Sequence, residues 1–214
     1  GDKNAGNGKA VALSSLLLGD GTNGGLASNY VLGSGTVDIT KATISTISGI
    51  TANGKTYDGS TNATLNTNGV TFNGMVAGDA LTLGAGFTGL FADANAGSNK
   101  AVTISGLSLA GADAGNYTLT SNTASALANI AQRVISLSGN RVYDGTTALD
   151  HSMLTLSNLV GNETLTLSGT GSMGDKNAGD GKSVNLGSLS LGDSIHGDGG
   201  LASNYVLGTG TVDI

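Results

Sequence analysis

The sequence has no cysteine, no proline and no tryptophan, and its 214 residues include a single glutamate, Glu163. The lack of cysteine excludes a disulfide framework and a thiolate metal site, and it is compatible with secretion, where a free thiol is a liability. Charged residues make up only 11% of the chain, and the net charge of -6 is spread thinly without any basic run. Nucleic acid and anionic membrane surfaces are therefore poor partners.

Long apolar runs are also missing. No stretch approaches the roughly 18 apolar residues of a membrane span, so no membrane insertion is expected, and the sequence starts without a signal peptide. The chain is instead rich in glycine, with 37 residues, and its solubility rests on serine, threonine and asparagine. Few cytosolic enzymes have such a composition.

All five tyrosines belong to two recurring phrases. Tyr57 and Tyr143 open Tyr-Asp-Gly-Ser/Thr-Thr, whereas Tyr30, Tyr117 and Tyr205 stand in Asn-Tyr-Val/Thr-Leu. The first pair is 86 positions apart, and the other three are 87 and 88 apart. Because two unrelated markers keep one period, the chain is predicted to be a tandem array of modules of about 86 residues.

A third marker, Asp-x-Asn-Ala-Gly, fixes the order within a unit. It recurs at 2–6, 93–97 and 175–179, each time ahead of an Asn-Tyr phrase and, at the second and third places, after a Tyr-Asp-Gly phrase. By this order residues 1–40 are the C-terminal half of a truncated module, residues 41–133 form a complete second module, and residues 134–214 form a complete third module. We call these the first segment, the second module and the third module.

The units fall into two types. Gly1–Ile39 and Gly174–Ile214 agree at roughly three quarters of their positions once a two-residue insertion is allowed, whereas the second module is more distant. This indicates an alternating array with a super-period near 173 residues, the separation of Gly1 and Gly174. The parent protein is then expected to be much longer.

Periodicity favours strands and supports no helix. Apolar residues alternate with Thr, Ser or Asn at 71–72, 80–83, 100–105, 116–121, 154–157 and 164–168. Asn-Gly dipeptides at 7–8, 53–54, 68–69 and 73–74 suit tight hairpins. Short strands at intervals of about 8–12 residues, with a period too long for one solenoid coil, predict an all-β fold of small β-sandwich modules, Ig-like or related, joined end to end as an elongated array.

The repeated phrases are interpreted as structural motifs. A tyrosine that buries its ring and hydrogen-bonds a backbone carbonyl through its hydroxyl pins a strand to a loop, and the Asp and Gly that follow form a local turn. Replacing Tyr57 with alanine should therefore lower the melting temperature of the second module. The predicted structural residues are Tyr57, Asp58, Gly59, Tyr143, Asp144 and Gly145 of the first phrase, and Asn29, Tyr30, Asn116, Tyr117, Asn204 and Tyr205 of the second.

The phrases at 142–147, 174–179 and 109–119 resemble the YDG-type repeat and its MBG relatives. The resemblance covers essentially all of the chain. It implies a module of very large exported bacterial proteins, namely filamentous-haemagglutinin-like exoproteins of two-partner secretion and biofilm-matrix adhesins. Two departures stand out: residues 1–40 lack the Tyr-Asp-Gly half, and the junctions at Thr40-Lys41 and Gln132-Arg133 lack the proline often found there.

The sequence contains no recognisable catalytic or metal-binding motif, so neither an enzyme nor a cofactor is predicted. His151 and His196 have no acidic or thiol partners at a metal-ligand spacing. Calcium is conceivable at the acidic glycine loops 19–25 and 192–200, but each loop offers only one or two carboxylates, and Asx turns explain them better. A Lys–Asn/Asp isopeptide bond at Lys55 is disfavoured because Arg141 takes the equivalent position.

Three functional hypotheses remain. The leading one is a structural stalk or spacer of a large adhesin, secreted or on the bacterial cell surface, that contacts the adjacent modules of its own chain and supports adhesion or biofilm formation. The second is a module that binds extracellular polysaccharide or a host surface by avidity, although the lack of tryptophan argues against a stacking site. The third is self-assembly through strand edges of the incomplete first segment.

Overall fold

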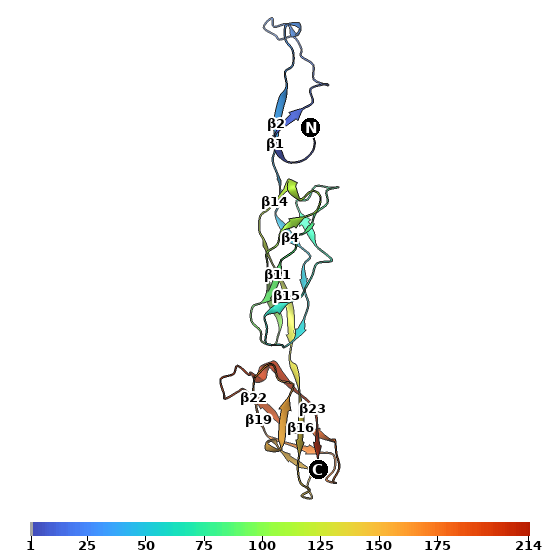
Figure 1. Cartoon of the computed structure of the whole chain (residues 1–214), viewed down its shortest axis with the longest axis vertical. Coiled ribbons are helices and arrows are strands. Elements are labelled where there is room, and N and C mark those ends of the chain that lie inside the picture. The colour runs from blue at the N-terminus through green and yellow to red at the C-terminus, as the bar shows by residue number, and fades with distance from the viewer. Residues whose placement is uncertain (1) are drawn as a thin grey trace. The chain divides into compact units, whose positions relative to one another are not determined.

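The computed structural model describes residues 2–214, and these residues form strands joined by turns, with no α-helix (Figure 1). The all-β prediction is confirmed. Within the described residues the only helical elements are four short 3-10 turns: η1 (Ala27–Asn29), η2 (Ala114–Asn116), η3 (His151–Met153) and η4 (Ala202–Asn204). Three of them carry the asparagine of an Asn-Tyr phrase at their last position, so the tyrosine that follows starts an extended segment.

The chain divides into two compact units whose limits differ from those of the sequence modules. Unit 1 holds the chain up to Ile50 together with Thr67–Thr88 and Ile104–Ala124, and unit 2 holds the rest. Both units therefore include part of the second module. Consequently, the boundary between the first segment and the second module lies within unit 1, and the boundary between the second and third modules lies within unit 2.

Unit 1 is built from two-stranded ladders. The pairs are β1 with β2, β4 with β9 and β10 with β13, all antiparallel, and β3 with β14, which is parallel. Their bounds are β1 Gly6–Val11, β2 Gly35–Ile39, β3 Ala42–Ile44, β4 Thr46–Ser48, β9 Thr71–Asn73, β10 Thr82–Leu83, β13 Leu109–Ala110 and β14 Tyr117–Leu119. The apolar residues of the second module that are buried here include Ile44, Ile47 and Tyr117.

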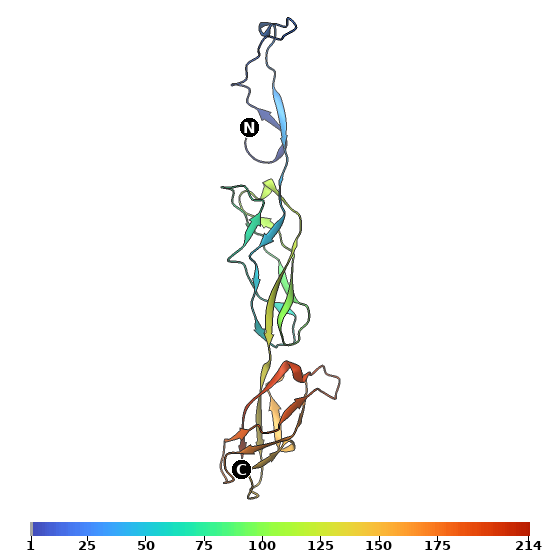
Figure 2. The same ribbon diagram turned by 180° about the vertical axis from the view of Figure 1, so that it is seen from behind.

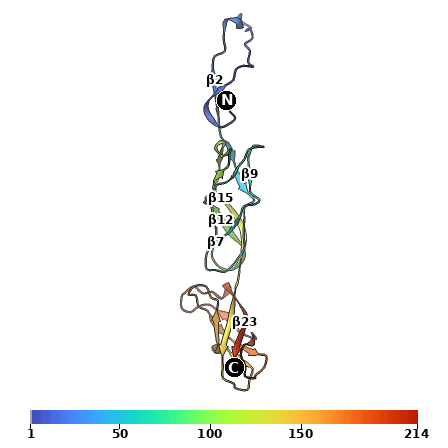
Figure 3. The ribbon, with the colours of Figure 1, turned by 45° about the vertical axis from the view of Figure 1, so that its right-hand side comes forward.

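Unit 2 has two larger sheets and two small ladders. One sheet has the order β6-β15-β12-β11-β7 and the other β17-β20-β21-β23-β16-β18, while β5 pairs with β8 and β19 with β22. Figure 1 shows β16 and β23 side by side, Figure 2 shows the same strands from behind, and Figure 3 shows β12 with its neighbour β15. The bounds are β5 Thr51–Ala52, β6 Lys55–Thr56, β7 Asn62–Ala63, β8 Leu65–Asn66, β11 Thr88–Phe91, β12 Gly97–Ser105, β15 Thr123–Ala131, β16 Arg133–Asn140, β17 Ala148–Asp150, β18 Leu154–Ser157, β19 Thr166–Ser168, β20 Thr170–Met173, β21 Lys182–Asn185, β22 Ser190–Gly192 and β23 Tyr205–Asp213.

The second and third modules repeat the same pairings. In each module the strand that begins with the Asn-Tyr tyrosine runs parallel to the first strand, with Tyr117 opposite Ala42 and Tyr205 opposite Arg133. An antiparallel pairing follows along the chain, made by the next strand in the second module (β4 with β9) and by the same strand in the third module (β16 with β18). A parallel pair of this kind joins the start of a module to its end, so each module closes on itself and can be repeated in tandem.

Alternation buries one face of each long strand, as half-buried strands require. Ile135 and Leu137 of β16 are buried while their neighbours are exposed, and they face a core built from both halves of the third module. The core cluster consists of Leu137, Leu149, Met173, Val184, Leu189 and Val212. By contrast, none of residues 2–40 is buried.

The expected hairpin role of the Asn-Gly dipeptides is wrong. Asn53-Gly54 links β5 to β6, yet β5 pairs with β8 and β6 with β15, so the two strands diverge. Asn68-Gly69 likewise links β8 to β9, which have different partners. Asn7-Gly8 lies inside β1, where the register with β2 shifts and Gly8 takes a φ of 63°. The dipeptides thus mark a bulge at Gly8, where the left-handed backbone favours glycine, and two points where the chain changes partner strand.

Candidate functional site: two module joints

The Asp-x-Asn-Ala-Gly phrase folds into the same small turn at all three places. Asp93 accepts a hydrogen bond from the Asn95 backbone N–H at 2.8 Å and an ion pair from Lys100 at 2.6 Å. Asp175 makes the equivalent contacts with Asn177 and Lys182, and Asp2 those with Asn4 and Lys9. The lysine always stands seven positions after the aspartate, so the spacing Asp-x6-Lys is the sequence signal of this turn. These bonds present the central Asn-Ala pair outward.

Within unit 2, the Asn-Ala pair of the second module meets the Asn-Tyr phrase of the third. The Ala96 N–H donates to Asn204 Oδ1 at 2.8 Å, and Asn204 Nδ2 donates to Asn95 Oδ1 at 3.0 Å. Asn204 is fully buried, and its amide is satisfied by this pair of bonds. Gln132 adds a bond from Nε2 to the Ser203 carbonyl at 3.0 Å. We call this contact joint 2.

Within unit 1, the same bonds connect the first segment with the second module. The Ala5 N–H donates to Asn116 Oδ1 at 2.9 Å, and Asn116 Nδ2 donates to Asn4 Oδ1 at 3.1 Å. We call this contact joint 1. Since two boundaries between different module types use one hydrogen-bond pattern, Asn-Ala and Asn-Tyr act as complementary halves of a joint, in addition to any role inside a module.

A carboxylate stands beside the asparagine pair in both joints. In joint 2, Glu163 accepts from the Tyr57 hydroxyl at 2.6 Å through Oε1 and from the Tyr205 hydroxyl at 2.7 Å through Oε2. The two rings meet edge to face with centroids 5.3 Å apart, and the Val160 N–H donates to the Tyr205 hydroxyl at 3.0 Å. The prediction that these hydroxyls bond a backbone carbonyl is wrong. Both donate instead to Glu163, the single glutamate of the chain.

Joint 1 has an aspartate and a lysine in the corresponding places. The Tyr117 hydroxyl donates to Asp79 at 2.7 Å and accepts from the Val76 N–H at 3.0 Å, as Tyr205 does with Glu163 and Val160. Lys3 of the first segment completes the site with an ion pair to Asp79 at 2.6 Å. The hydrogen bond from Lys3, followed by that from Tyr117, lowers the pKa of Asp79.

The Tyr-Asp-Gly phrase forms a turn held by a cation. Asp58 accepts from the Ser60 N–H at 2.9 Å, and Lys55 reaches both Asp58 and the Ser60 carbonyl. In the third module Asp144 and Arg141 make the same kind of turn around Thr146. Lys55 and Arg141 thus have the same role, an ion pair that stabilises the turn, and this role needs no isopeptide bond.

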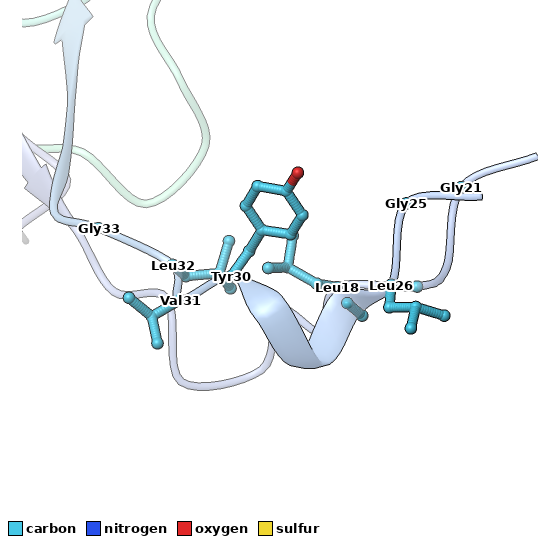
Figure 4. A pocket seen from close by; sticks show the side chains of 10 residues that line it. Leu18, Gly21, Gly25, Leu26, Tyr30, Val31, Leu32 and Gly33 are labelled. Carbon is cyan, nitrogen blue, oxygen red and sulfur yellow. The ribbon is translucent and has the colours of Figure 1, made fainter. Parts of the chain in front are cut away.

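Of the five tyrosines, three have buried rings, including Tyr117 at joint 1, and two are exposed. Tyr57 and Tyr205 are 3% and 2% exposed, whereas Tyr143 is 54% and Tyr30 is 67% exposed. Tyr30 lines an apolar hollow of about 410 Å³ together with Leu18 and Leu32. Figure 4 shows its hydroxyl pointing away from the neighbouring side chains. The predicted tyrosine residues are therefore not equivalent: only those at a joint, or next to one, have buried rings.

The carboxylates of the acidic glycine loops accept hydrogen bonds from backbone N–H groups. Asp193 accepts from Ala202 at 2.8 Å and Asp20 from Ala27 at 2.7 Å. Asp198 binds Thr164 and Gly200, and these bonds, with one from Ser194, lower its pKa to about 2. Across residues 2–214 no three His, Asp or Glu side chains gather as metal ligands would, and no helix is long and apolar enough to cross a membrane.

Comparison with protein families identifies the module. The sequence model described as the YDG domain matches residues 40–124 and again residues 129–212, together well over half of the chain. The chain belongs to the YDG domain family. The tandem YDG domains correspond to the second and third modules and thus confirm the repeat. No curated protein and no solved structure matches the chain significantly.

Two separate constraints favour glycine in the YDG phrase: the backbone conformation and the space beside the residue. Gly59 and Gly145 both adopt a left-handed backbone, with φ of 74° and 78°. A Cβ on Gly59 would also stand 3.0 Å from Val160 Cγ1 across joint 2, whereas one on Gly145 would meet only Tyr143 Oη at 3.9 Å.

Alanine at either glycine should therefore destabilise the chain, but not equally. We expect Gly145→Ala to cost about 1 kcal/mol for the left-handed backbone, and Gly59→Ala about 1 kcal/mol more because Val160 must move. Urea unfolding measures both values, and Gly145→Ala is the matched control. Equal losses would show that Gly59 has no role in the joint.

Alkaline titration should reveal the buried tyrosines. Burial, and then the bond to Glu163, raises the pKa of Tyr205 to about 12 and that of Tyr57 still further, from an ordinary value of 10.0. The unfolded chain loses these protons first, so the stability that depends on them is complete below pH 10.0 and is lost as pH rises toward the folded pKa values.

Tyrosinate absorbance followed against pH measures this effect, with Tyr205→Phe to assign the late step. Glu163→Gln should lower the late midpoint and reduce the loss of stability between pH 10 and 12. A late step that does not respond to Glu163→Gln would contradict the assigned role of the carboxylate.

Proposed function

We propose that these YDG domains form a structural spacer within a large exported bacterial adhesin, on the cell surface or secreted. The observation that carries the proposal is the recurrence of one joint at two successive module boundaries, built on Asn116 and Asn204. A chain whose motifs mainly connect one module to the next is suited to holding other parts of the adhesin at a fixed distance from the cell. The adjacent modules of the same chain are its partners, and adhesion or biofilm formation is the process that it supports.

The composition supports the same proposal. Absence of cysteine suits an extracellular polymer, and export by two-partner secretion accords with the family resemblance. Neither His151 nor His196 belongs to a cluster of candidate ligands within residues 2–214, and the acidic loops use their carboxylates locally. We therefore propose a non-enzymatic role that needs no cofactor, and no contact with nucleic acid.

Localisation and length dependence test the spacer directly. An antibody against the third module should detect the protein at the surface or in the medium of the producing bacterium. Deleting one super-period of about 173 residues, the separation of Gly1 and Gly174, should preserve export but weaken adhesion in proportion to the shortened reach. A cytoplasmic protein, or adhesion indifferent to repeat number, would contradict the proposal.

Self-assembly is the second candidate, and one observation favours it over binding to glycans. The first segment exposes Val37 and Leu16 at 51% and 54%, while their third-module counterparts Val212 and Leu189 are buried. An uncovered sheet face of this kind can accept strands from another chain. Sedimentation at increasing concentration distinguishes a monomeric spacer from such an assembly.

A further inference from the structure

Joint 1 contains a cavity where joint 2 contains a side chain. The cavity measures about 260 Å³, and its walls include Val76, Asp79 and Tyr117 of the second module. These are the counterparts of Val160, Glu163 and Tyr205, as their hydrogen bonds show. In joint 2 this place holds Tyr57, whose ring packs against Tyr205 and whose hydroxyl binds Glu163.

We propose that the cavity beside Tyr117 is a socket for the tyrosine of a YDG phrase. The incoming ring would lie edge to face on Tyr117, as Tyr57 does on Tyr205, and its hydroxyl would donate to Asp79. Because Lys3 is 68% exposed where it reaches Asp79, it can yield or share this carboxylate. A phenol fits the socket better than an aliphatic side chain, since only a hydroxyl uses the acceptor at its base.

A second uncovered surface, on the first segment, indicates which segment would carry this tyrosine. The first segment exposes Tyr30, Val37 and Leu16, and its counterpart in the third module buries the same positions against residues 134–173. Residues 174–214 agree with the first segment at roughly three quarters of their positions. A segment similar to residues 134–173, which cover 174–214 in the third module, should therefore also cover the exposed face of the first segment. It carries Tyr143, the exposed YDG tyrosine of this chain.

One occupant therefore fits both vacancies: a YDG half-module that resembles residues 134–173. Its strands would pair with β2 as β16 pairs with β23, and its tyrosine would enter the socket. The same segment buries Leu137 and Leu149 in its present position, so it has the apolar face that such pairing needs. The occupant is a half-module linked ahead of the first segment in the same polypeptide, as residues 134–173 are linked ahead of Gly174.

The test adds a copy of residues 134–173 ahead of the first residue of the full chain. A matched variant carries alanine in place of the tyrosine in the added copy only, and the unextended chain is the reference. Hydrogen exchange is followed at Val37 in β2, at Ala5 in joint 1 and at Val76, whose N–H binds Tyr117.

We expect both extended chains to slow exchange at Val37, because the added strands cover that face. Only the chain with the added tyrosine should slow exchange at Val76 further, by about tenfold, and Asp79→Asn should remove most of that difference. Unchanged exchange at Val37 in both extended chains would overturn the half-module as occupant.

Slower exchange at Val37 with equal exchange at Val76 in the two extended chains would overturn the socket alone. Protection of Val37 in a mixture of separate chains, without protection inside one extended chain, would likewise overturn the proposed occupant, because the half-module would then not pair within its own polypeptide. None of these outcomes depends on export or adhesion, so failure here leaves the proposed spacer function to its own test.

Discussion

Replacing Glu163 with alanine should lower the free energy of unfolding of the chain by about 3 kcal/mol, because two tyrosine hydroxyls lose a charged acceptor at once. Tyr57 and Tyr205 are almost fully buried, so water cannot easily replace the carboxylate. Tyr205 keeps the bond from the Val160 N–H, whereas the Tyr57 hydroxyl loses the carboxylate to which it donates. Urea unfolding of the full chain measures the loss.

Two controls separate the joint from general effects of charge. Glu163→Gln keeps the shape and one good acceptor, so about 1 kcal/mol is expected. Asp180→Ala removes an exposed carboxylate of the same module and should change the stability by less than about 0.5 kcal/mol. A double-mutant cycle with Tyr57→Phe isolates the bond that crosses the module boundary. Additive losses in the cycle would contradict direct coupling between Tyr57 and Glu163.

Asn204→Ala should cost about 2 kcal/mol and should speed hydrogen exchange at Ala96. The substitution removes a fully buried amide and leaves the N–H of the half-buried Ala96 without its acceptor, and an unsatisfied buried group costs about 1–3 kcal/mol. The chain provides its own control, because Asn29 stands in the same ten-residue phrase but is exposed. Asn29→Ala should change the stability by less than about 0.5 kcal/mol.

Joint 1 allows a graded comparison. Asn116 makes the same pair of bonds but is only half buried, so Asn116→Ala should have an effect between those of the other two variants. Exchange at Ala5 reports on joint 1, and exchange at Ala96 reports on joint 2. Three equal effects would mean that the asparagine serves only its own loop.

Much of the fold could be predicted from the sequence, because its signals are periodic and local. The 86-residue spacing of Tyr57 and Tyr143 revealed the modules, and apolar alternation located strands such as β12 and β18. Strand ends were less accurate: the pattern at 80–83 forms only the two-residue β10. Short strands end where hydrogen-bond partners end, which the sequence of one strand does not specify.

The joints could not be predicted, because their partners are remote in sequence. Asn95 and Asn204 are 109 positions apart, and Tyr57 and Glu163 are 106 apart. Motifs that recur in tandem modules suggested that each module needs them for its own fold. A contact between neighbouring modules produces the same periodicity, so the sequence does not distinguish the two. Glu163 carried one signal, being the only glutamate, but nothing in its Gly-Asn-Glu-Thr context indicates a phenolic partner.

The difference between the two joints has a mechanical consequence. Joint 1 depends partly on the exposed Lys3–Asp79 ion pair, which dissolved salt screens, whereas joint 2 depends on buried phenol and amide groups, which salt affects little. Links in series carry the same tension, so the weaker kind opens first. In saline surroundings we expect a pulled chain to lengthen first at joints of the lysine type, while those of the glutamate type hold their alignment.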